Sequence, residues 1–165
     1  MNAETQPIPP APWHLTGQAV AFLASPLVLR LLVKYRSSPV GPYLEHALAI
    51  PTLRGPRVTQ MSVDSELSKI GGRTIWGYPK TLEQLSWQRD GDRLIFRREN
   101  QTFRLRLWGP MFPLLLPFWT VQTLNGADVR VPAQLKATAR LAFRGRQMAL
   151  FLEEFAMTFE PPGLL

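Results

Sequence analysis

Segments of strand length, rich in Val, Leu, Ile and aromatic residues, recur along the chain, and turns rich in proline and glycine separate them. The chain has 16 prolines and 11 glycines among 165 residues. Antiparallel strands joined by short turns are the simplest account of this pattern. We therefore predict a mainly β, single-domain fold, antiparallel and barrel-like, with one or two short helices. The predicted strands cover residues 18–24, 27–36, 43–50, 57–63, 82–88, 94–98, 101–108, 117–124 and 134–143.

One short helix is expected within this pattern. Asp64 or Ser65 can cap a helix over residues 66–70, because a short polar side chain accepts hydrogen bonds from the first helical N–H groups. Gly71 and Gly72 follow directly and are predicted to end it, since glycine is the usual residue after a helix.

Three other segments fit the strand pattern less well. Residues 1–13 contain four prolines and no periodicity, so they are predicted to form an extended N-terminal arm before a domain over residues 14–165. Residues 109–119 are too short and too proline-broken to span a membrane, and we expect a rigid apolar loop that caps a pocket or makes a subunit contact. Residues 148–159 fit a closing strand or a short amphipathic helix, and periodicity does not decide between them.

Composition excludes several functional classes. The hydrophobic content of 45% is enough for a real core. Without cysteine there is no disulfide, thiol nucleophile or Cys-ligated zinc, and His14 and His46, the only two histidines, leave little for a metal site. We expect no metal and no cofactor. Because the chain starts without the basic region of a signal peptide and lacks an unbroken apolar span, we expect a cytoplasmic protein with no membrane partner.

The basic charge of the chain suggests nucleic acid as a partner, but its distribution argues against one. The formal net charge is +7, and Arg97, Arg98, Arg104 and Arg106 lie near aromatic residues on two predicted strands. Alternating arginine and apolar residues are also typical of a half-exposed sheet. We therefore favour a solvated outer face over a nucleic-acid partner.

Lysine is rare in this chain, which draws attention to Lys80. Of the 19 basic residues, 15 are arginine and four are lysine. A genome-wide preference for arginine codons is one explanation. The other is that a lysine is present for its chemistry, because lysine can lose its proton and arginine effectively cannot. Lys80 stands in the motif I-G-G-R-T-I-W-G-Y-P-K-T, between glycines and aromatics, and is our candidate amine nucleophile.

Glu45 lies inside a predicted apolar strand. A carboxylate there must be paired, hydrogen-bonded or neutral. Structural pairing with an arginine is the simpler alternative to a functional role. On the preceding strand Arg30, Lys34 and Arg36 share one parity, so they lie on one face, which either lines a polar cavity or meets solvent.

Several motifs resemble those of the acetoacetate decarboxylase family. The pattern G-R-x-x-x-G-x-P-K is met at residues 72–80, and G-P-Y-x-E at residues 41–45. The stretches V-K-Y-R-S-S-P-V and V-D-S-E-L-S-K-I also fit, in the family's order and separation. The resemblance implies a β-barrel-like domain with an internal apolar pocket. It also implies that Lys80 is the Schiff-base lysine and Glu45 the pocket glutamate.

The implied chemistry is decarboxylation of a β-keto acid through an iminium. An exposed lysine, with a pKa near 10.4, is almost always protonated at pH 7, and the family is a known case of a lysine activated by desolvation or by a neighbouring cation. Apolar neighbours such as Trp76 and Tyr78 would supply the desolvation. Glu45 would orient intermediates or move protons. Arg73, or Lys34 and Arg36, would position the substrate carboxylate, and Tyr43, Trp76 and Tyr78 would complete the binding site.

One position departs from the family pattern. Members that decarboxylate acetoacetate typically carry a second lysine directly after the first, and here that residue is Thr81. The resemblance therefore leaves the substrate open, since relatives with the same lysine carry out aldol and dehydration chemistry on larger keto acids. We expect a keto-acid lyase that forms a homo-oligomer. The alternatives are a non-catalytic barrel that binds a small carbonyl or carboxylate ligand, and a basic surface-binding module.

Overall fold

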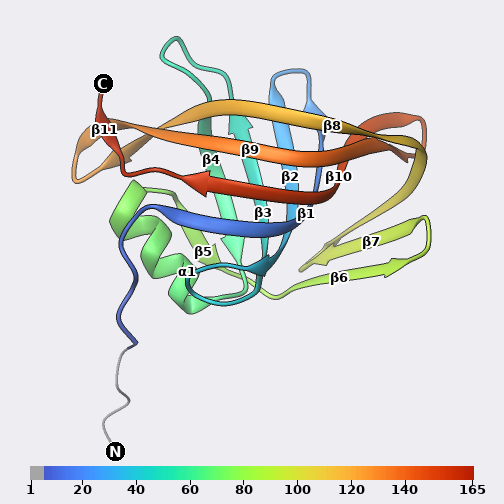
Figure 1. Cartoon of the computed structure of the whole chain (residues 1–165), viewed down its shortest axis with the longest axis horizontal. Helices are drawn as coiled ribbons and strands as arrows, with labels where there is room; N and C mark the ends of the chain where they lie inside the picture. Colours follow the sequence, from blue (N-terminus) through green and yellow to red (C-terminus); the bar gives the residue numbers. More distant parts are fainter. Residues whose placement is uncertain (1–5) are drawn as a thin grey trace, which may run out of the picture.

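The computed structural model describes residues 6–165, and most of these residues lie in strands (Figure 1). The mainly β prediction is confirmed. Residues 1–5 of the expected arm lie outside the described part of the chain, and Trp13, its last residue, begins the first strand and is buried. The strands are β1 Trp13–Ser25, β2 Val28–Ser37, β3 Tyr43–Ile50, β4 Arg57–Val63, β5 Lys80–Leu82, β6 Leu85–Asp90, β7 Arg93–Arg98, β8 Gln101–Leu124, β9 Ala127–Arg144, β10 Gln147–Phe159 and β11 Gly163–Leu164.

The strands form one curled sheet that does not close. Its order is β5-β4-β3-β2-β1-β10-β9-β8-β7-β6, with β11 added beside β9. Neighbours are antiparallel except β4 and β5, which are parallel because a helical segment connects them. The segment at residues 148–159, which the sequence left undecided, is strand β10 and pairs with β1 and β9.

The two faces of the sheet enter two separate cores. On β2, Val33 and Tyr35 belong to one core, which also contains Trp13 and is called the Trp13 core below. Leu32, which directly precedes Val33, belongs to the second, called the Phe103 core after its residue on β8. Successive side chains of a strand point to opposite faces, so one strand supplies both cores. Full burial of each large apolar side chain stabilises the fold by roughly 1.5–3 kcal/mol.

The helical segment is longer than predicted. Helix α1 (Glu66–Gly71) is capped by Ser65, whose side chain accepts a hydrogen bond from the Ser68 N–H. The prediction that Gly71 and Gly72 end it is wrong, because both have right-handed helical backbone and the chain continues as a π-helix, η1 (Gly72–Trp76). Gly77 ends it instead, with φ of 76°, a conformation that favours glycine.

The predicted apolar loop at residues 109–119 is also wrong, because β8 runs through it to Leu124. Beyond Phe112 this strand pairs with β9 on one side, whereas its pairing with β7 ends at Arg106. A strand with one free side tolerates proline, since some of its N–H groups have no sheet partner to lose. In and directly before this segment, β8 leaves several large apolar side chains exposed: Trp108, Met111, Phe112, Leu115, Leu116 and Trp119.

In the described part of the chain, the helices are too short or too polar to cross a bilayer.

Candidate functional site

Lys80 is the first residue of β5, and the sheet holds its side chain inside the Trp13 core. The strand runs parallel to β4, where Met61 lies opposite Lys80. Glu45 reaches the same space from β3, whose alternation points every second side chain toward this core. The Lys80 and Glu45 side chains are each only 5% exposed. The sheet and the connection from α1 to β5 thus bring together two charged groups that are 35 residues apart in sequence.

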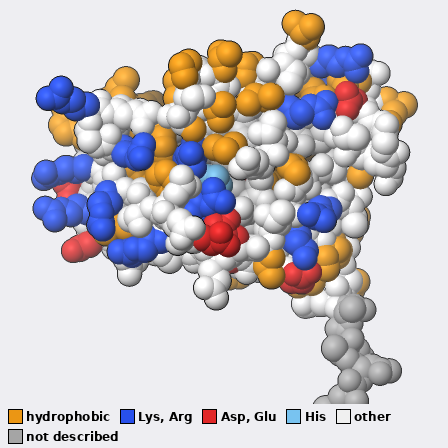
Figure 2. Space-filling view, turned by 180° about the vertical axis from the view of Figure 1, so that it is seen from behind, with side chains coloured by type: hydrophobic (Ala, Val, Ile, Leu, Met, Phe, Trp, Pro, Cys, Tyr) orange, Lys and Arg blue, Asp and Glu red, His pale blue; other side chains and the backbone are white. Residues whose placement is uncertain are grey.

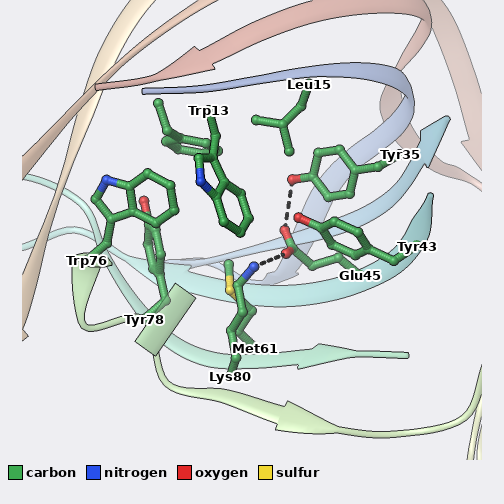
Figure 3. Close-up of a pocket in the computed structure, with 10 residues that line it drawn as sticks. Trp13, Leu15, Tyr35, Tyr43, Glu45, Met61, Trp76, Tyr78 and Lys80 are labelled. Atoms are coloured by element: carbon green, nitrogen blue, oxygen red, sulfur yellow. Dashed lines mark hydrogen bonds and ion pairs between the residues drawn. The ribbon is translucent and has the colours of Figure 1, made fainter. Parts of the chain in front are cut away.

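The amine of Lys80 has two polar neighbours and one aromatic neighbour. Its Nζ lies 3.2 Å from Glu45 Oε2 (Figure 3). It also donates a hydrogen bond of 3.0 Å to Ser68 Oγ. It also lies 5.3 Å from the centre of the Tyr43 ring. The amine is therefore buried but not isolated, as buried charges must be.

Tyr35 holds the other oxygen of Glu45. Its hydroxyl donates a hydrogen bond of 3.1 Å to Glu45 Oε1, which leaves Oε2 facing Lys80 (Figure 3). Burial, followed by the negative charge of Glu45, raises the pKa of Tyr35 and of Tyr43 well above the ordinary value of 10. Burial also raises the pKa of Tyr78. All three phenols therefore stay protonated at neutral pH, and the Tyr35 hydroxyl is the one that donates to Glu45.

The double glycine of the motif makes room for this site. A Cβ on Gly72 would lie 2.5 Å from both Cδ and Cε of Lys80, closer than any stable contact. A Cβ on Gly71 would lie 2.5 Å from the ring of Trp13. The glycines are therefore explained by close packing of Lys80 and Trp13 against α1 and η1, and not by the end of a helix.

A small cavity lies between these side chains. Its volume is about 10 Å³, roughly the space of one water molecule. The walls are mostly aromatic and apolar, with one carboxylate and one amine. The lining residues are Trp13, Leu15, Tyr35, Tyr43, Glu45, Met61, Trp76, Tyr78, Lys80 and Phe159 (Figure 3).

Five of the predicted site residues line this cavity and three do not. Tyr43, Glu45, Trp76, Tyr78 and Lys80 are in the first group.

We expected Lys34, Arg36 or Arg73 to reach the cavity, and this expectation is wrong. Lys34 and Arg36 flank Tyr35 on β2, so they point away when Tyr35 points in. Arg36 is exposed and pairs weakly, at 3.8 Å, with Glu154. Arg73 is exposed as well, but its Nε donates a hydrogen bond of 2.6 Å to the backbone oxygen of Lys80. Arg73 thus fixes the backbone that carries the lysine and does not face a substrate.

The structural alternative for Glu45 was an arginine partner, and its partners are instead Lys80 and Tyr35. Sequence reasoning missed Tyr35 and Ser68. Tyr35 could have been found by parity, because it alternates with Lys34 and Arg36. Ser68 gave no signal of its own, since a serine in a short helix is common. Its importance comes from the turn of α1 that faces β5.

Comparison with known proteins agrees with this geometry. A family model described as acetoacetate decarboxylase (ADC) matches residues 12–105. A crystal structure of acetoacetate decarboxylase from Legionella pneumophila is similar with a TM-score of 0.64 and 14% sequence identity, over 99% of this chain and 94% of that chain. A second, from structural studies of acetoacetate decarboxylase, has a TM-score of 0.56 and 13% identity, over 94% and 88% of the two chains. A comparison with curated proteins finds no match. At these identities the solved structures indicate a shared fold.

Proposed function

Because the chain belongs to the acetoacetate decarboxylase family, we propose that it is a Schiff-base-forming lyase that acts on a small keto acid, with Lys80 as its amine nucleophile. The observation that carries the proposal is the buried Lys80 amine, held 3.2 Å from the Glu45 carboxylate in a mostly apolar cavity. A buried lysine with a single acid beside it is the arrangement that amine catalysis needs, because the amine must be positioned and able to give up its proton.

The Lys80–Glu45 pair can supply a neutral amine without moving charge into or out of the core. Ammonium with carboxylate and amine with carboxylic acid carry the same net charge, so a proton that shifts from Lys80 Nζ to Glu45 Oε2 costs no additional charge burial. Tyr35 donates to Glu45 and Lys80 donates to Ser68. These contacts keep both groups in place while the proton moves.

In the proposed reaction the amine attacks the ketone carbon, and the carbinolamine loses water to form an iminium. The bond between the α-carbon and the carboxyl carbon then breaks, and CO2 leaves. The electrons of that bond form a carbon–carbon double bond while the π electrons of the iminium move to its nitrogen, which gives an enamine. Protonation at carbon and hydrolysis release the ketone and regenerate Lys80. Glu45 is placed to return the proton that it takes from the amine and to assist the loss of water.

Within the described chain, Lys80 is the sole cation among the cavity-lining residues. A substrate carboxylate would therefore lie among aromatic side chains without a second positive partner. Such a contact favours decarboxylation, because a tight ion pair would stabilise the ground state more than the transition state, in which the charge is dispersed. In this proposal the apolar walls position the substrate carboxylate, the role that the sequence analysis gave to Arg73 or to Lys34 and Arg36.

The cavity is too small for any keto acid as it stands, so binding requires side chains to move. Acetoacetate-sized substrates need the smallest displacement, which supports a small keto acid. An aldolase or dehydratase that acts on a larger keto acid would use the same Lys80 chemistry and would need a larger opening. We therefore rank decarboxylation of a small β-keto acid first.

Borohydride trapping tests the proposal. The chain is incubated with a panel of β-keto and α-keto acids, reduced with sodium borohydride and digested, and the adduct is located by mass spectrometry. We expect a single adduct on Lys80, lost in Lys80→Ala and retained in Lys136→Ala, which removes an exposed lysine of β9. Release of CO2 separates a decarboxylase from an aldolase or dehydratase.

The same experiment separates the non-catalytic alternatives. If keto acids raise the melting temperature but no adduct forms with any of them, the chain is a barrel that binds a carbonyl or carboxylate ligand without turnover. If neither occurs and salt-sensitive binding to polyanions is found, it is a basic surface-binding module. An adduct that persists in Lys80→Ala would place the nucleophile elsewhere, with Lys34 the next candidate.

We also propose a homo-oligomer, as expected from the sequence. The exposed apolar side chains of β8 support it, because contiguous apolar surface on a folded chain usually has a partner. Light scattering after size exclusion measures the mass. Leu115→Lys, at a residue 75% exposed, should reduce it to that of one chain if this surface is the contact.

A further inference from the structure

A second cluster of charged side chains lies on the other face of β3 from Lys80. Glu45 faces the Trp13 core, so the next residue, His46, faces the opposite side, where its ring stacks near Phe103 with centres 6.3 Å apart. His46 is fully buried. Its Nε2 accepts a hydrogen bond of 2.7 Å from Arg30 Nη1 and lies 3.4 Å from Arg98 Nη1. One ring nitrogen thus holds two guanidinium groups together.

A third arginine approaches the same aromatic surface. The guanidinium carbons of Arg30 and Arg144 lie 4.8 and 5.4 Å from the centre of the Phe103 ring. These residues come from β2 and from the end of β9, with Arg98 from β7, so three strands far apart in sequence converge. On the face seen in Figure 2, Lys and Arg side chains gather on the side of β6 and β7.

The cluster carries more positive charge than its acidic partner neutralises. Glu83 accepts two hydrogen bonds from Arg98, each 2.9 Å. In residues 6–165, Arg30 and Arg144 form no ion pair. Burial, then the charges of Arg98 and Arg144, lower the pKa of Arg30, as expected of a cation that lacks a counter-charge. With His46 neutral, three arginines and one glutamate leave two unmatched positive charges.

Two buried donors of the cluster also lack an acceptor in the described chain. His46 Nε2 accepts a hydrogen bond, so its neutral ring carries the proton on Nδ1, and that N–H has no partner. The Nε of Arg30 is buried and unpartnered too. Buried donors are normally satisfied, because an unmet donor is costly. Within the described chain, the arginine and histidine side chains of this cluster therefore lack both a full counter-charge and hydrogen-bond acceptors.

We propose that Arg30, Arg98 and Arg144 form a binding site for a phosphate group, separate from the Lys80 cavity. A phosphate dianion matches the two unmatched positive charges, and its oxygens are acceptors of the kind that guanidinium groups bind in pairs. His46 is a positioning residue that holds Arg30 and Arg98 together through Nε2. A carboxylate carries half the charge and fits less well. The group is either free inorganic phosphate or the phosphoryl group of a small metabolite.

Calorimetric titration of the full chain with inorganic phosphate and with glycerol phosphate, at constant ionic strength set with sodium chloride, tests the site. We expect saturable binding of one phosphate group per chain, weaker binding of acetate, and binding that survives Lys80→Ala. Tighter binding of one phosphate probe than the other identifies the source. Arg30→Gln should raise the Kd about tenfold or more, because a charge-assisted hydrogen-bond partner is lost.

Two further variants test whether a loss of binding comes from misfolding or from the general positive charge of the surface. Arg144→Gln alters an exposed end of the site and should weaken binding without unfolding the chain. Arg104→Gln removes the same charge from an exposed position on β8 and should leave binding unchanged. The proposal is overturned if phosphate binds no better than chloride or acetate. It is also overturned if Arg104→Gln weakens binding as much as Arg30→Gln, or if only nucleic acid binds.

Discussion

Gly72 and Lys80 are packed so closely that a single added methyl group on Gly72 would overlap Cδ and Cε of the lysine. The glycine lies at the start of η1 and the lysine at the start of β5, so the π-helix and the strand form opposite walls of one narrow slot. The lysine therefore occupies its position because its neighbour has no side chain, and the amine reaches Glu45 from there.

Gly72→Ala should impair chemistry more than stability. Alanine is favourable in helical backbone, but its Cβ would lie 2.5 Å from Lys80 Cδ and Cε, and the flexible lysine is the group that can move. We expect keto-acid trapping at Lys80 to slow by about tenfold or more, with a change in unfolding free energy within about 1 kcal/mol. Gly163→Ala, where a Cβ meets no atom within 4 Å, is the control and should behave as wild type. Equal trapping rates in wild type, Gly72→Ala and Gly163→Ala would contradict the inference that Gly72 makes room for Lys80.

Glu45→Gln tests proton transfer without changing shape. The amide oxygen can still accept from Tyr35, but the side chain can neither take a proton from Lys80 nor neutralise its buried charge, so stability should fall together with the rate. We expect the rate of iminium formation to fall by roughly 10²-fold. Single-turnover trapping and thermal unfolding measure the two effects. A rate equal to wild type would show that Glu45 has only a structural role.

Thr81→Lys tests the departure from the family pattern. Thr81 is exposed on β5, and its hydroxyl donates to the backbone oxygen of Met61 at 3.3 Å, so its side chain points away from the buried Lys80. A lysine there would lie mostly in solvent, where its charge is screened. We expect decarboxylation and trapping rates within about threefold of wild type. A tenfold increase would mean that position 81 reaches the cavity during turnover.

His46 should make stability depend on pH. Burial, followed by the charges of Arg98 and Arg30, lowers its pKa from 6.5 to about 4, although Glu83 acts in the opposite direction. The unfolded chain therefore binds the proton more tightly. The stabilisation is complete above pH 6.5 and is lost progressively as the pH falls toward 4, by about 3 kcal/mol in total.

Denaturant unfolding between pH 4 and 7.5, in phosphate-free buffer, measures this slope. His46→Gln cannot titrate, so its stability should fall less steeply than that of wild type over the same range. Parallel curves for the two proteins would rule out His46 as the source. The exposed His14, which hydrogen-bonds Thr158, serves as the control position.

The sequence by itself determined the strand-rich fold and the identity of the central pair. An apolar run predicted β3 and alternation predicted β4, both with their observed ends, because turns containing proline and glycine lie before both strands. Lys80 and Glu45 were singled out because a rare lysine and an acid within an apolar strand both need an explanation. The motifs added the family resemblance, which the family match over residues 12–105 confirms.

Only the tertiary structure decided what surrounds that pair. Gly71 and Gly72 look like a helix end in sequence, but two side chains distant along the chain, Trp13 and Lys80, pack on them. Proline-rich residues 109–119 look like a loop, but β8 continues there because one side of it needs no partner. The sequence also did not predict that Arg30, Arg98 and Arg144 lie close together. The alternation of residues within a strand determines which face of the sheet a side chain occupies. The order and register of strands distant in sequence determine which other side chains lie on that face.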